Sequence, residues 1–130
     1  MKYLLDTHIF LWWILNNSKL SKLSKSAKKA ITNAENDLYL SSASTWEMVI
    51  KSTIGKLSLP SPPEILVREQ LILNAVIALD ISIEHTLALS KLPMLHKDPF
   101  DRILIAQSIC ENLTIITDDP LIKAYEVKCL

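Results

Sequence analysis

The chain has 130 residues, of which 49% are hydrophobic and 22% charged, a composition typical of a folded globular protein and not of a disordered one. This length predicts one domain, residues 1–130, long enough to bury its own core. Basic and acidic residues both number 14, so the net charge indicates no particular partner. The single glycine, Gly55, excludes the P-loop and the dinucleotide fingerprint, because both need several glycines.

The chain shows no sign of a membrane or a secretory destination. No apolar run approaches the ~18 residues of a spanning helix, and residues 1–6 turn acidic too soon for a signal peptide. We therefore expect a cytoplasmic protein without a membrane partner. Cys110 and Cys129 have no CxxC spacing, so we expect free thiols rather than a disulfide or a zinc site.

The first predicted elements are a short buried strand and an apolar helix. The strand covers residues 2–6 and ends in Asp6, and the helix covers residues 9–15. Because this helix is apolar nearly all round, it must be buried or meet a partner. Trp12 and Trp13 are therefore candidates for a dimer or ligand face, although core packing is expected of at least one.

A second helix is predicted from Ser24, as its N-cap, to about Ala34. The polar face of this region is rich in lysine. Such a run attracts phosphates in some proteins, but a solvated face is its commoner meaning. The lysines concerned are Lys19, Lys22, Lys25, Lys28 and Lys29.

The middle of the chain begins with a strand at residues 38–42, followed by a helix over residues 44–53. Ser44 and Glu47 have the S-x-x-E spacing of a capping box, which gives Glu47 a structural explanation. A further helix over residues 61–73 starts at a Ser-Pro-Pro sequence, and a third strand follows at residues 75–79.

The last third of the chain is expected to hold two further helices and a strand. Ser82 caps a helix through Ser90, in which His85 is expected to be structural. Pro99 suits a first helical turn, which makes Asp98 the N-cap and Asp101 a first-turn residue of a helix that ends near Cys110.

The strand predicted at residues 113–117 is rich in β-branched residues, as in a parallel sheet, and is followed by Asp118 and Asp119. A short helical turn is expected after Pro120, and residues 127–130 are a candidate edge strand.

This alternation of strands and helices predicts a three-layer α/β/α fold with a mainly parallel central sheet of four to five strands. Ligands of such folds sit beyond the carboxyl ends of the strands. Asp6 ends the first strand and the Asp118-Asp119 pair ends the fourth, while the helices that bear Glu47 and Asp101 begin just after a strand or a loop. One acid from each of these four places is therefore expected at one rim of the sheet.

Each acid alone is explained as a helix cap or a partner of the helix dipole. Gathered together, carboxylates repel one another and raise each other's pKa, which a fold does not sustain without compensation. A bound cation supplies that compensation. The oxygen ligands and the lack of a Cys or His cluster at zinc spacing favour Mg²⁺ or Mn²⁺.

Four motifs closely resemble the PIN-domain proteins of the VapC toxin family, and the match covers nearly the whole chain. The resemblance implies a metal-dependent ribonuclease, usually the toxin of a toxin-antitoxin pair, often dimeric and silenced by a cognate antitoxin. The motifs are Leu-Leu-Asp-Thr-His, Ser-Thr-Trp-Glu-Met, Asp-Pro-Phe-Asp-Arg-Ile-Leu-Ile-Ala-Gln and Ile-Ile-Thr-Asp-Asp-Pro.

By this resemblance Asp6, Glu47 and Asp101 match the first three acids of the family, and Asp119 matches the fourth, with Asp118 in the variable place. Asp6 and Asp101 are then the principal metal ligands. The supporting residues are less specific. Asp98 is a candidate to bind metal through water or to cap its helix, and capping is favoured. Three threonines lie where hydroxyls orient ligands or phosphate, and one arginine is a candidate for the RNA backbone or the surface. These last residues are Thr7, Thr45, Thr117 and Arg102.

Three alternatives compete with this interpretation. A metal-free histidine mechanism is disfavoured because nothing pairs two of His8, His85 and His96. A receiver-type phosphoacceptor needs adjacent acids after the first strand and an acid ending a middle strand, whereas Asp6 stands alone and the second strand ends in serines. A non-catalytic binding module of the same fold is disfavoured only because the motif acids are present. The apolar surroundings of Trp12, Trp13 and Trp46 are candidates for a dimer interface or an antitoxin groove.

Overall fold

A four-stranded parallel sheet forms the centre of the computed structural model, which describes residues 1–130. The strand order is β3-β2-β1-β4, so β1 lies inside the sheet with a parallel neighbour on each side. The strands are β1 (Lys2–Leu5), β2 (Asp37–Ser41), β3 (Ile77–Leu79) and β4 (Thr114–Ile116).

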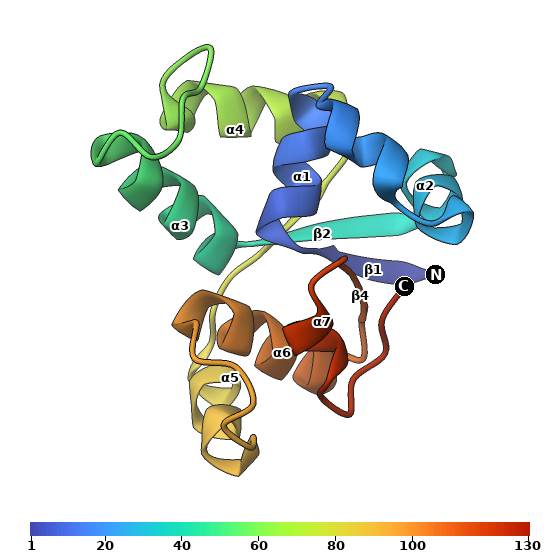
Figure 1. The fold of residues 1–130 in the computed structure, drawn as a ribbon, viewed down its shortest axis with the longest axis vertical. Helices are drawn as coiled ribbons and strands as arrows, with labels where there is room; N and C mark the ends of the chain where they lie inside the picture. The colour runs from blue at the N-terminus through green and yellow to red at the C-terminus, as the bar shows by residue number, and fades with distance from the viewer.

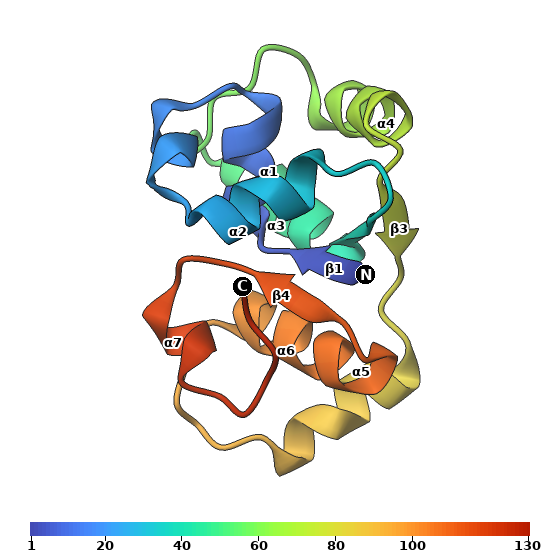
Figure 2. The ribbon, with the colours of Figure 1, turned by 90° about the vertical axis from the view of Figure 1, so that its right-hand side faces the viewer.

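Helices cover both faces of this sheet (Figures 1 and 2). One group, with α1 to α4, lies on one side, and α5 to α7 lie on the other, which confirms the predicted three-layer architecture. The helices are α1 (Thr7–Ile14), α2 (Lys25–Thr32), α3 (Ser42–Thr53), α4 (Pro63–Leu73), α5 (Ile83–Ala88), α6 (Pro99–Glu111) and α7 (Pro120–Lys123), with short 3₁₀ turns η1 (Ser18–Lys22) and η2 (Leu89–Lys91).

Each face of the sheet has its own apolar core. Phe10 of α1 and Ile31 of α2 belong to one buried cluster, which also contains side chains of β1 and β2. Leu104 and Ile105 of α6 belong to the other, with Leu4 of β1. Alternate side chains of a strand point to opposite faces, so β1 contributes to both cores and is buried on both sides.

The predicted caps of α2, α5 and α6 are confirmed. Ser24 accepts from the Ala27 N–H at 3.1 Å, and Asp98 accepts from the Phe100 N–H at 2.9 Å. Ser82 caps α5 as part of a reciprocal pair, because the Nδ1 atom of His85 accepts from the Ser82 N–H. The structural role expected of His85 is therefore confirmed.

The capping box expected at Ser44 and Glu47 is wrong. The helix starts two residues earlier, at Ser42, and its cap is Ser41, whose hydroxyl accepts from the Ala43 N–H at 3.0 Å. Glu47 consequently lies in the second turn of α3, too far along to cap anything. Its carboxylate needs another explanation.

The C-terminal segment forms less than the expected edge strand. Ile115 of β4 and Cys129 form a single parallel bridge, with hydrogen bonds from the Ile115 N–H to Lys128 and from the Leu130 N–H to Ile115. Cys110 and Cys129 are both free thiols, as predicted. None of the helices is both long and apolar enough to cross a membrane.

The sheet register brings three chain segments to one edge. Leu5 pairs with Ile116, and Ser41 pairs with Leu79, so the residues after β1, β2 and β4 emerge side by side. The Asp6 N–H donates to Ile116 at 3.0 Å, which places the end of β1 against the end of β4. The carboxyl-end rim that the sequence predicts is present.

Candidate metal centre

Asp6 occupies the turn between β1 and α1 and is almost fully buried, with 1% of its surface exposed. Although it stands at the N-cap position of α1, its side chain caps nothing. Its Oδ2 atom accepts from the Thr117 hydroxyl at 2.7 Å, while its Oδ1 atom has no hydrogen-bond partner. Burial raises the pKa of Asp6, against the lowering effects of the Thr117 hydrogen bond and of His8.

Glu47 reaches the same rim from α3 and is 3% exposed. Its Oε2 atom forms an ion pair with Lys51, one helical turn later, at 2.9 Å. Its Oε1 atom is buried without a hydrogen-bond partner. Burying a carboxylate oxygen without a donor is costly, so its position at this rim calls for a ligand that the side chains do not provide.

Asp101 lies in the first turn of α6, as predicted, and is 6% exposed. Burial and then the charges of Asp6 and Asp98 raise its pKa to about 7, although His96 lowers it and Glu47 raises it further. Because the charges of Asp6, Asp98 and Glu47 all raise the pKa of Asp101, these three carboxylates lie near it.

Asp119 completes the group from the start of α7. Its Oδ1 atom caps the helix by accepting from the Leu121 N–H at 2.9 Å, and its Oδ2 atom faces the cluster. The Asp119 N–H donates to the Thr117 hydroxyl at 3.0 Å, so this threonine links Asp119 to Asp6. Asp119 therefore combines the capping role with a place in the cluster.

His96 is a member of the cluster that the sequence interpretation had set aside. Its Nε2 atom lies 2.8 Å from Asp101 Oδ2 and 3.2 Å from Asp119 Oδ2. Because its Nδ1 atom accepts from the Asp98 N–H, Nε2 is the donor nitrogen, and it donates to Asp119 Oδ2. His96 thus holds Asp119 by a hydrogen bond and lies in close contact with Asp101. Its sequence signal was its place two residues before the Asp98 cap, in the loop that leads into α6.

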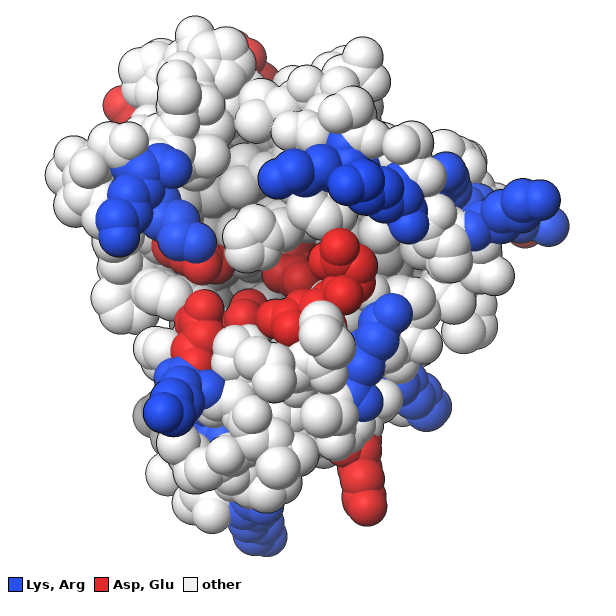
Figure 3. Space-filling model, viewed as in Figure 1, with Lys and Arg blue, Asp and Glu red and all other residues white.

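The acids form a recessed negative patch with positive residues around it. In Figure 3, red side chains gather in a hollow across the middle of the molecule, and lysine or arginine side chains lie on both sides of that hollow. A cavity of about 170 Å³ is lined by Thr7 and Glu47 and also by Lys51 and Lys56. A negatively charged substrate would thus meet cations before it met the acids.

The donor set fits a hard divalent cation. Asp6 Oδ1 and Glu47 Oε1 are buried without hydrogen-bond partners, although His8 Nδ1 lies 3.9 Å from Asp6 Oδ1. The charges of both Asp6 and Glu47 act on Asp101. His96 Nε2, Asp101 Oδ2 and Asp119 Oδ2 also lie within 4.8 Å of one another. Oxygen-rich sets of this kind suit Mg²⁺ or Mn²⁺ better than zinc.

The threonines named by the sequence have separate roles. Thr117 bridges Asp6 and Asp119, as described above. The Thr7 hydroxyl donates to the buried Ser44 hydroxyl at 2.8 Å, which ties α1 to α3 beside the cluster. Thr45 is not brought to the site, because its hydroxyl donates to the Ser42 carbonyl and the residue lines a different cavity, next to α4.

The remaining sequence candidates lie around the cluster or outside it. Asp98 caps α6 while its charge acts on Asp101. Asp118 is exposed and forms neither a hydrogen bond nor an ion pair with the cluster. Arg102 corrects the expectation of a surface or RNA contact: it is 9% exposed, and its guanidinium donates to the Pro93 carbonyl and the Tyr125 hydroxyl in the interior.

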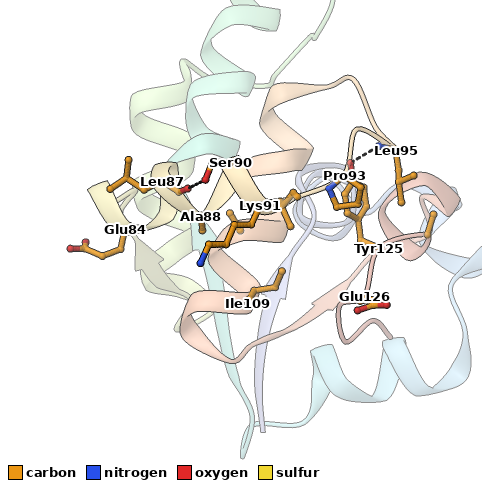
Figure 4. A pocket seen from close by; sticks show the side chains of 13 residues that line it. Glu84, Leu87, Ala88, Ser90, Lys91, Pro93, Leu95, Ile109, Tyr125 and Glu126 are labelled. Carbon is orange, nitrogen blue, oxygen red and sulfur yellow. Dashed lines mark hydrogen bonds between the residues drawn. The ribbon is translucent and has the colours of Figure 1, made fainter.

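A much larger cavity lies elsewhere. It measures about 950 Å³ and lies between α5, η2, α6 and the residues that follow α7. Figure 4 shows its mostly apolar lining, with Glu84, Lys91 and Glu126 among the charged side chains. It contains none of the four clustered acids, so cavity size does not identify the reactive site.

Comparison with known proteins agrees with this architecture. The chain is similar over its full length to VapBC2 from Rickettsia felis bound to promoter DNA, with 17% sequence identity, a TM-score of 0.72 and 98% of that chain covered. It is also similar over its full length to VapBC-1 from nontypeable Haemophilus influenzae, with 18% identity, a TM-score of 0.63 and 97% of that chain covered. A third similar structure is DNA-bound VapBC from Salmonella typhimurium, with 15% identity, a TM-score of 0.66, and 100% of this chain and 97% of that chain covered. At these identities the likeness shows the fold alone. No curated protein matches the sequence.

The family model of the PIN domain matches residues 3–128, which is nearly the whole chain. The matched region contains every clustered acid and the whole parallel sheet except Lys2. This chain therefore belongs to the PIN-domain family.

Proposed function

We propose that the protein is a metal-dependent ribonuclease that hydrolyses phosphodiester bonds at the Asp6, Glu47, Asp101 and Asp119 cluster. The observation that carries this proposal is that one carboxylate oxygen of Asp6 and one of Glu47 are buried without hydrogen-bond partners. Both acids lie near Asp101, whose pKa is raised. PIN domains are generally nucleases, and PIN nucleases typically use divalent metals. The choice of RNA rests on the resemblance of the motifs to VapC toxins.

The four acids would hold Mg²⁺ or Mn²⁺, with Asp6 and Asp101 as principal ligands and Glu47 and Asp119 completing the set. A bound ion of this kind lowers the pKa of a water molecule, positions the scissile phosphate and neutralises developing charge. The neighbours of the acids keep them in place. Thr117 orients Asp6, and His96 fixes the Oδ2 atoms of Asp101 and Asp119.

In this proposal Lys51 both neutralises Glu47 and attracts the RNA. It neutralises Glu47 at 2.9 Å, and its own pKa is raised by that hydrogen bond, so it stays protonated at neutral pH. About a third of its side chain remains exposed (38%), next to Lys56 in the small cavity beside the acids. The two ammonium groups are placed to attract an RNA phosphate toward the negative cluster.

We further propose that the protein is the toxin of a toxin-antitoxin pair, that a cognate antitoxin silences it, and that it acts as a homodimer on cytoplasmic RNA. The support is the VapC-like motifs together with the fold shared with three VapBC complexes. Co-expression with the protein encoded beside it tests the antitoxin. Cleavage that persists in the presence of every adjacent open reading frame's product would favour a free-standing nuclease.

Cleavage of single-stranded RNA tests the activity, with added Mg²⁺ or Mn²⁺ compared against EDTA. We expect metal-dependent cleavage by the wild type and its loss in Asp6→Asn and Asp101→Asn. Asp37→Asn is the matched control, because Asp37 is exposed at the opposite end of its strand. Cleavage that survives EDTA would exclude the metal mechanism. Folded wild type that binds RNA without cutting it would support the non-catalytic binding module.

A further inference from the structure

Two aromatic rings stand beside the acid cluster without a role in holding metal. Trp46 of α3 and Phe100 of α6 meet edge to face, with ring centroids 5.2 Å apart at 80°. We call this pair the aromatic ledge. Phe100 is partly buried against the core, whereas Trp46 is 59% exposed. An indole held this open to water offers a large apolar surface for a ligand.

The ledge is joined to the cluster through the chain itself. Trp46 immediately precedes Glu47 in α3, and Phe100 immediately precedes Asp101 in α6, so each helix carries one ring and one acid as consecutive residues. Figure 1 shows α3 and α6 beginning close together, on opposite sides of the end of the sheet. The ledge is therefore formed by the same two helices that carry two of the candidate metal ligands, Glu47 and Asp101.

A cavity of about 330 Å³ adjoins the ledge and continues its apolar character. Its lining comes from α3, α6 and the segment around α5, and includes Ala43, Ile81 and Ile103 as well as the two rings. Thr86 is its one polar side chain. This surface has too few hydrogen-bonding groups to read base edges, but it suits the flat face of a ring.

The two sides of the acid cluster differ in charge. Lys51 and Lys56 lie with Glu47 in the small cavity on one side, where phosphates would be attracted. The aromatic ledge and its apolar cavity contain no lysine or arginine. RNA has the same division, with charged phosphates on its backbone and uncharged bases that stack on aromatic rings.

We propose that the aromatic ledge, Trp46 on Phe100, binds one unpaired nucleobase of the RNA next to the phosphate that is cut. The site selects single-stranded or looped RNA, because a paired base keeps both faces stacked in its duplex. This inference rests on the proposed ribonuclease function and assigns to it a substrate subsite. Stacking also supplies attraction that does not depend on charge, next to acids that repel the backbone.

A variant series tests the site by cleavage of a short single-stranded RNA. Trp46→Ala should lower kcat/KM roughly five- to hundredfold, the range expected for losing one stacked base. The loss should lie in KM, since the base stays stacked from binding through reaction. Trp46→Phe should keep most of the activity because a ring remains. Ile54→Ala is the control, as an equally exposed apolar residue (58%) at the end of α3.

Abasic substitutions in the RNA make the test specific. Removing the base at one position beside the cut should slow the wild type as much as Trp46→Ala does, and should add nothing in that variant. The Trp46→Ala effect should also be equal at low and high salt, because stacking is not screened. Equal sensitivity of wild type and Trp46→Ala to every abasic position would overturn the proposal.

The ledge has one competing occupant, a second copy of the chain. Trp46 shares an exposed helix face with Val49 and Ile50, so the face also resembles a dimer surface. If Trp46→Ala turns a dimer into a monomer in sedimentation and high protein concentration restores cleavage, the ledge is an interface and the base site is overturned. Wild type that cuts no RNA would instead refute the proposed function itself.

Discussion

Replacing Asp101 with asparagine provides the sharpest test of the shared acid site. In the metal-free protein the pKa of Asp101 is raised from 3.8 to about 7, chiefly by burial and by the charges of Asp6 and Asp98. Between about pH 4 and pH 7, Asp101 therefore keeps its proton in the folded state but has lost it in the unfolded chain. Across this window the unfolding free energy of the wild type falls as the pH rises, and above it the penalty is complete.

The size of the effect follows from that pKa. The change from 3.8 to about 7 corresponds to at most about 4 kcal/mol at pH 8. The asparagine side chain is also buried, and it loses the 2.8 Å contact that the carboxylate makes with His96. These two costs offset part of the gain in unfolding free energy. We expect Asp101→Asn to gain about 1–3 kcal/mol in EDTA, or about 4 °C in Tm for each kcal/mol in a domain of this size.

Thermal unfolding in EDTA at pH 5 and pH 8 measures this gain. The gain should be about 2–3 kcal/mol smaller at pH 5, because there the folded wild type still keeps its proton and the penalty is only partly developed. Mn²⁺ should then stabilise the wild type more than the variant, because one ligand is missing. Asp37→Asn should change neither result. A gain equal at both pH values, or melting unchanged in EDTA and in Mn²⁺, would refute the reasoning that the acids share one site.

Four further outcomes are expected. Since a metal must displace the proton of Asp101, Mn²⁺ affinity measured by calorimetry should fall about tenfold per pH unit below pH 7 and level off above it; a flat profile would contradict the pKa. His96→Gln should weaken Mn²⁺ binding roughly 10–100-fold with little change in fold by circular dichroism, because His96 orients two acids. Arg102→Met should cost about 2–4 kcal/mol in urea unfolding, since it strips buried acceptors of their donor, and a surface-like loss near zero would refute its interior role. Gly55→Ala should cost about 1 kcal/mol through its φ of +77° alone, as nothing lies within 4 Å of the added Cβ.

Much of the fold was predictable because it depends on local patterns. The alternation of apolar strands with capped helices predicted the parallel three-layer architecture, and Ser24, Ser82 and Asp98 marked the helix starts by residue type and spacing. The start of α3 was placed two residues late, because Ser41 and Ser44 are equally good caps by sequence. Only the pairing of β2 with its neighbours decides between them.

The candidate site divides in the same way. Asp6, Glu47, Asp101 and the Asp118-Asp119 pair were placed at one rim from element order, since residues that follow parallel strands share one edge of the sheet. The resemblance to VapC proteins then selected Asp119 of that pair. The roles of His96 and Arg102 were not predictable. A histidine or an arginine in a loop or a first helical turn gives no sign of whether it faces solvent, an acid or the interior.

The sequence by itself determined which residue types stand at strand ends and helix starts, because those depend on neighbours within a few positions. The tertiary structure alone decided which polar groups meet. Thr117 reaches Asp6 from the end of the neighbouring strand, His96 lies between Asp101 and Asp119, and two carboxylate oxygens are buried without a hydrogen-bond donor. The physical reason is that burial and hydrogen-bond satisfaction depend on segments far apart in the chain, which only packing brings within contact distance.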